Sequence, residues 1–173
     1  MRNRVVLYIL AITSIFLSSI SLLPAQDKQI NWELYSMGTW RIRFYIPQGI
    51  NLSPGTSGDW ATLTGRSSND IEINAQVKRV WLPVEDIEEE ALKRLKLKKQ
   101  DIALLDSGIR NVLNYRVYQA TENLQNKKSV KIIFIANHQH QNFSYLVYLT
   151  VPPGIYEQNK EDFKFWYTNL YGS

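Results

Sequence analysis

The sequence predicts an α+β fold, in which helices pack on an antiparallel β-sheet, and three observations lead to this class. Residues 130–136 and 143–151 are β-branched and aromatic runs too short for helices of normal length, as is typical of strands. The polar residues 138–142 between them have the length of a hairpin loop, so we expect antiparallel pairing. An amphipathic helix near the C-terminus is the third observation.

The two strands are expected to be central strands of the sheet. Ile132 and Phe134 alternate with Ile133 and Ile135 in the first run, so both faces of this strand are apolar. Strands of this kind need cover on both sides.

The C-terminal helix is predicted to begin after Asn159, an N-cap residue. Phe163, Trp166, Tyr167 and Leu170 recur at the spacing of one helix face. We expect this aromatic face to lie on the sheet as a structural lid.

Earlier strands are expected at 40–46, 60–64 and 71–77, where apolar and polar residues alternate or β-formers cluster. They are predicted to form a meander. Residues 53–59 and 65–70 are rich in turn formers and are interpreted as loops.

The middle of the chain predicts a helix over residues 84–99, with acidic residues early and basic residues late, as the helix dipole favours. The carboxylates of residues 88–90 are placed on its solvated face, where nothing raises a pKa for acid catalysis. An apolar link at 102–105, a turn at 106–108 and a strand at 115–121 follow.

The N-terminus has the pattern of a secretory signal peptide. Arg2 and Arg4 precede the apolar run 5–23, and Ala25 supplies a small residue for cleavage. We expect a signal peptide over 1–25 and one domain over 26–173. The alternative is an uncleaved membrane anchor, since the run approaches the length that spans a bilayer.

Composition excludes several classes of function. The chain has no cysteine, so disulfide scaffolds, thiol catalysis and Cys-ligated metals are excluded. The formal net charge of +4 falls to +2 when Arg2 and Arg4 are removed, because all 16 acidic residues follow the signal segment. Such a domain lacks the basic face that nucleic-acid binding requires.

No nucleotide-binding or nucleophile motif is present, and we expect no cofactor. His138 and His140 are the two histidines of the chain and form an HxH pair without a nearby carboxylate. They are expected to lie in a solvated hairpin loop and to bind no metal tightly.

Aromatic residues beside turns are the remaining candidates for contacts with a sugar or a protein partner. Trp60, Trp81 and Tyr156 are the aromatic candidates, with His138 and His140 beside them. The alternative is that these rings pack in the core and at its rim.

The order of elements resembles that of the Mog1/PsbP-like proteins. The resemblance rests on residues 40–49, the strand at 71–77, the helix after Pro83, and the final strand and helix ending at Leu170. It implies an α/β/α sandwich, an antiparallel sheet with helices on both faces. Members that look like this include photosystem extrinsic subunits, a nuclear transport factor and bacterial envelope proteins, mostly binding or assembly proteins. No functional residue of the family maps onto this chain.

The sequence therefore predicts an exported, non-enzymatic binding or assembly protein of the cell envelope, in the periplasm or secreted. Its partner is expected to be an envelope protein or a glycan, with no nucleic acid and no stable membrane insertion after cleavage. Two alternatives stay open: an exported hydrolase whose site is assembled from residues distant in sequence, and a carrier of a small molecule or lipid.

Overall fold

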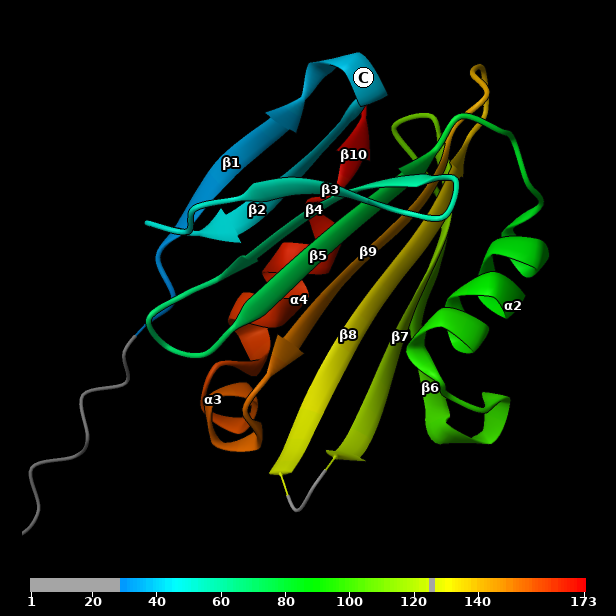
Figure 1. The fold of residues 1–173 in the computed structure, drawn as a ribbon. Helices are drawn as coiled ribbons and strands as arrows, with labels where there is room; N and C mark the ends of the chain where they lie inside the picture. The colour runs from blue at the N-terminus through cyan, green and yellow to red at the C-terminus, as the bar shows by residue number, and fades with distance from the viewer. Residues whose placement is uncertain (1–28, 125–126) are drawn as a thin grey trace, which may run out of the picture.

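The computed structural model describes residues 29–124 and 127–173. Over these residues the protein is mostly antiparallel β-sheet with few helices (Figure 1). The predicted signal peptide, residues 1–25, lies outside the described residues. None of the described helices is both long and apolar enough to cross a membrane.

A seven-stranded sheet forms the body of the molecule, with the strand order β3-β4-β5-β9-β8-β7-β6. Every neighbouring pair is antiparallel. Its strands are β3 (Ser53–Ser57), β4 (Trp60–Arg66), β5 (Glu72–Lys78), β6 (Ile102–Arg110), β7 (Leu113–Leu124), β8 (Lys127–His138) and β9 (Ser144–Val151).

The prediction of two paired central strands is confirmed. In β8 and β9, Ile133 lies opposite Tyr148 and Ile135 lies opposite Leu146. Alternate residues of β8 enter two different core clusters, Ile133 and Ile135 in one and Ile132 and Phe134 in the other. Both faces of this strand are therefore buried, as its apolar pattern predicts.

One cluster forms beneath α2 (Val84–Leu95), where Ile87, Ala91 and Leu95 pack with residues of β7, β8 and β9. The helix is shorter than the predicted span of 84–99. It ends because Lys96 adopts a left-handed conformation, φ 55°, and the Leu97 N–H donates to the Leu92 carbonyl, 2.9 Å away. A short 3-10 turn, Lys99–Asp101, leads into β6.

The other cluster joins the large sheet to α4 (Lys160–Thr168) and to a three-stranded sheet of order β1-β2-β10. These strands are β1 (Trp32–Met37), β2 (Ile42–Pro47) and β10 (Tyr171–Gly172). Phe163 and Trp166 of α4 are buried, and the Trp166 Nε1–H donates to the Tyr45 carbonyl, 2.8 Å away. The aromatic face of the predicted helix is therefore buried.

Several elements differ from the sequence prediction. The helix α3 (Pro153–Gln158) precedes α4, and the Asn159 side chain bonds to the Ile155 carbonyl of α3 rather than capping α4. Trp40 belongs to a 3-10 turn, Gly38–Trp40, and not to a strand. The predicted meander holds for β4 and β5, which pair antiparallel, but is wrong for β2, which pairs with β1 and β10 in a separate sheet.

Residues interpreted as loops form both edge strands of the large sheet. β3 covers most of the turn-rich segment 53–59, and β6 covers the apolar link and turn predicted at 102–108. Edge strands pair on one side only and face solvent, so neither hydrophobic alternation nor the exclusion of Pro and Gly applies to them strictly.

Candidate functional site

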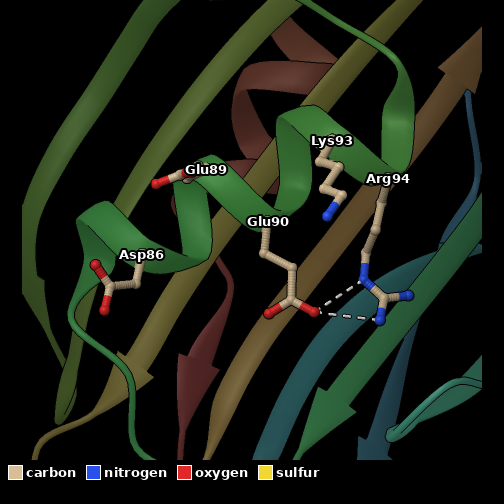
Figure 2. A pocket seen from close by; sticks show the side chains of 5 residues that line it. All are labelled: Asp86, Glu89, Glu90, Lys93 and Arg94. Atoms are coloured by element: carbon tan, nitrogen blue, oxygen red, sulfur yellow. Dashed lines mark hydrogen bonds and ion pairs between the residues drawn. The ribbon is translucent and has the colours of Figure 1, made fainter.

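The outer surface of α2 carries an open depression of about 570 Å³ lined by charged side chains. Figure 2 shows Asp86, Glu89, Glu90, Lys93 and Arg94 along this helix, with Glu90 and Arg94 joined by hydrogen bonds. The Arg94 guanidinium lies 3.2 Å from the Glu90 carboxylate. The two residues that meet in the depression thus neutralise one another.

Glu90 and Arg94 also attach α2 to the β3–β4 hairpin. The Trp60 Nε1–H donates to Glu90 over 2.7 Å, and Arg94 donates to the Ser57 carbonyl over 3.2 Å. At the hairpin tip, the hydrogen bond from Lys78 is the largest effect on the pKa of Asp59 and lowers it. These contacts fix a helix to a hairpin and engage the charges of Glu90 and Arg94.

Glu88 is buried, which corrects the expectation that residues 88–90 share a solvated face. Its carboxylate accepts hydrogen bonds from Arg116 over 2.7 Å and from the Tyr118 hydroxyl, and it pairs with Lys99 over 2.6 Å. Burial pushes the pKa of Glu88 upward, but the three donors outweigh it and lower this pKa to about 2. A carboxyl group held ionised in this way cannot serve as a general acid near neutral pH.

Trp60 and Tyr156 are core residues and not surface contacts. Trp60 is 1% exposed, and Tyr156 is 9% exposed. The Tyr156 hydroxyl donates to Gln119 over 2.6 Å, which satisfies its polar end. The alternative interpretation, packing in the core, holds for these two aromatics.

Trp81 lies on the surface, in the segment between β5 and α2, beside the exposed Val80. Tyr156 and His138 lie elsewhere in the fold, so the predicted contact residues do not form one site. No single patch brings together the five residues that the sequence singled out.

His138 is buried at the end of β8, opposite Leu113 of β7, so it does not lie in a solvated loop. Its Nδ1 accepts the backbone N–H of the exposed His140 over 3.1 Å. Burial lowers the pKa of His138. Within residues 29–124 and 127–173, no group of three His, Asp or Glu residues is arranged to hold a metal ion.

Sequence reasoning missed the most distinctive surface, the outer edge of β6. In the described part of the chain no strand pairs with this edge, and three of the seven exposed large hydrophobic residues belong to β6. Leu104, Leu105 and Ile109 are 57%, 37% and 68% exposed. An unpaired edge with apolar side chains is a template for another strand.

The opposite edge of the sheet, β3, differs from β6 in its side chains and in its backbone donors. Its residues are small and polar, and Pro54 lacks a backbone N–H. The apolar run 102–105 and Ile109 are visible in the sequence, but their spacing does not identify an edge strand. Only the sheet order reveals that these residues lie at an edge.

Comparisons with known proteins bear on the fold. No family model matches the sequence, and no curated protein matches it. The solution structure of cyanobacterial PsbP (CyanoP) from Synechocystis sp. PCC 6803 is similar over 83% of this chain and 94% of that chain, with 12% sequence identity and a TM-score of 0.56. A crystal structure of a protein of unknown function from Pseudomonas aeruginosa matches at 13% identity over 83% of this chain and 98% of that chain, with a TM-score of 0.43. The similarity to cyanobacterial PsbP shows that the chain has the PsbP-like fold that its element order predicts.

Proposed function

We propose that this protein is an exported, non-enzymatic binding or assembly module that adds an extended protein strand to the open edge of β6. The observation that carries the proposal is the edge itself, nine residues long, with Leu104 and Ile109 more than half exposed. Export is supported by the basic and apolar pattern of residues 2–25.

The physics of an open edge explains how such binding works. A strand at the end of a sheet has backbone N–H and C=O groups that point to solvent, and an incoming strand pairs with them. The exposed side chains of β6 then decide which strand fits. Leu104 lies opposite Tyr118 and Ile109 lies opposite Asn114 in β7, so both project from the same face.

The alternatives have less support among the described residues. A hydrolase needs a free acid, base or nucleophile in a cleft, but Glu88, Glu90 and Arg94 are engaged in ion pairs, and Asp86, Glu89 and Lys93 line an open depression on the surface of α2. A carrier needs a cavity, and the apolar gap between α2 and the sheet holds only about 10 Å³. The binding module needs neither.

The arrangement of the core supports the finer description of the fold as an α/β/α sandwich. We infer that α2 covers one face of the large sheet and α3 and α4 cover the other, because their buried residues belong to separate clusters. Both faces are then occupied by this chain, which leaves the edge as the place for a partner.

Photo-crosslinking tests the proposed function. A photoreactive amino acid replaces Ile109 in the exported protein, and the same residue replaces Val80, an exposed aliphatic residue far from β6 in the strand order, as the matched control. We expect a discrete protein adduct at position 109, attached through one defined segment of the bound chain, and none at position 80. No adduct at 109, or equal adducts at both positions, would show that β6 is not a binding edge.

A further inference from the structure

We infer that the strand bound by β6 is the β6 of a second copy of this chain, so that two sheets join into one across a two-fold axis at Ser107. This inference rests on the proposed function, since it names the partner of the same edge. It follows from how the side chains of β6 are distributed about Ser107.

The bulge in β6 makes the strand symmetric about Ser107. The register against β7 shifts between Leu104 and Asp106, which takes Leu105 out of the ladder. Leu104 and Ile109 therefore each lie two ladder positions from Ser107. The side chains of all three project from the same face of the sheet as Arg116 of β7. Without the bulge, Leu104 and Ile109 would face opposite sides of the sheet.

A two-fold axis at Ser107 then pairs apolar with apolar. Antiparallel strands place opposite residues on the same face, so Leu104 of one copy lies opposite Ile109 of the other, and this contact occurs twice. Both side chains are mostly exposed in the single chain, so pairing buries them.

Charges on the other face can accommodate this axis once the Ser107 N–H, which donates to the Asp106 carboxylate over 2.8 Å in the single chain, is released to pair with the second strand. Asp106 and Arg110 share that face, where they form an ion pair of 3.0 Å within one chain. An axis at Ser107 places both Arg110 and Asp106 of the second copy diagonal to Asp106, so each Arg110 offsets the repulsion between the two carboxylates. An axis at Asp106 would oppose two carboxylates, and an axis at Gly108 would leave Leu104 without an opposite residue.

The contrast between the two edges limits assembly to a closed pair. Continued growth of the large sheet would require β3 to accept a strand. Pro54 removes one backbone N–H donor from this edge, and no large hydrophobic side chain is exposed on it. An isologous β6–β6 contact uses the same edge of both copies and is closed by its two-fold axis, which gives a dimer and not a fibre.

Complementary variants test the pairing and its register. The protein as purified after export is expected to sediment with twice the mass of one chain at micromolar concentration. Leu104→Glu and Ile109→Lys, each alone, place a charge opposite an aliphatic residue twice per dimer, so each is expected to raise the dimer dissociation constant by about tenfold or more. Val80→Lys, which introduces the same charge elsewhere, is the control.

Mixing the two variants provides the decisive readout. A mixed dimer contains one native Leu–Ile contact and one contact between the introduced carboxylate and the introduced ammonium, so dimerisation is expected to return on mixing. Recovery on mixing also shows that both variants are folded. A parent dimer that neither variant weakens, or two weakened variants that do not recover when mixed, would overturn the inference.

A cysteine scan checks the axis independently, because the chain has no cysteine of its own. Opposite residues in antiparallel strands lie about 4.5–5.5 Å apart between Cα atoms, a distance that a disulfide spans. Ser107→Cys is therefore expected to form an inter-chain disulfide on mild oxidation, and Ala103→Cys, which lies opposite Arg110, is expected to form far less. Equal yields would refute the register.

The two proposals fail in different ways. A monomer at all concentrations, with a crosslink at position 109 to a different protein, refutes the second copy but keeps the binding edge. A monomer with no crosslink at position 109 refutes both.

Discussion

Removal of the Trp166 side chain tests whether α4 is held by burial. Trp166 is fully buried, and large aromatic residues at such sites cost about 3–5 kcal/mol when replaced by alanine. Trp166→Ala also removes the donor to the Tyr45 carbonyl, 2.8 Å away, which adds about 1 kcal/mol. We therefore expect the free energy of unfolding to fall by about 4–6 kcal/mol.

Urea unfolding measures this loss. With a denaturant slope of about 2 kcal/mol/M for a domain of this size, the midpoint should fall by about 2–3 M. Trp166→Phe keeps most of the apolar volume and loses the hydrogen bond, so its midpoint should lie between those of the parent and the alanine variant. Lys164→Ala, on the exposed side of the same helix, should change the free energy by no more than about 0.5 kcal/mol. Equal midpoints for Trp166→Ala and Lys164→Ala would refute the lid.

Three further predictions concern single positions. Glu88→Gln should remove up to about 3 kcal/mol of stability at neutral pH. In the parent this contribution is present above the unfolded pKa of 4.5 and is lost as pH falls toward the folded pKa of about 2. The free energies of unfolding of the two proteins, measured as a function of pH, should therefore converge near pH 2. Because the pKa of His138 is lowered in the folded state, the parent should lose stability as pH falls below its unfolded pKa of 6.5, and His138→Gln should flatten this dependence, whereas an unchanged slope would contradict it. Gly65→Ala should lower the melting temperature because its added Cβ would collide with Ile50 and the Asn51 carbonyl, whereas Gly154→Ala, which meets no atom within 4 Å, should not.

The sequence by itself determined the elements whose pattern is local. The central strands β8 and β9, the amphipathic helices α2 and α4, and the coarse order of strands, helix, strands and helix follow from hydrophobic periodicity, which depends only on neighbouring residues. That order was enough to predict the PsbP-like fold. The exclusion of thiol and Cys-ligated metal chemistry needs composition alone.

Only the tertiary structure decided which residues are buried among the polar and aromatic candidates. Trp60 and His138 stand beside turn-like sequence, yet the sheet and its neighbours cover both. The sequence pattern places Glu88 on a charged helix face, but its carboxylate accepts hydrogen bonds from Arg116 and Tyr118 of β7, which lie 28 and 30 positions away in the chain. Local patterns do not contain such distant partners.

The open edge is likewise a property of the whole sheet. Ile102–Arg110 has no strand-like alternation, because its exposed apolar residues pack in no core cluster and its bulge changes the face from which the following side chains project. Its position as the last strand is set by the pairing of β7 with β8 and of β8 with β9, contacts between residues far apart in the chain. The elements of this protein are therefore determined by local sequence, whereas its open edge arises only when the strands are ordered in space.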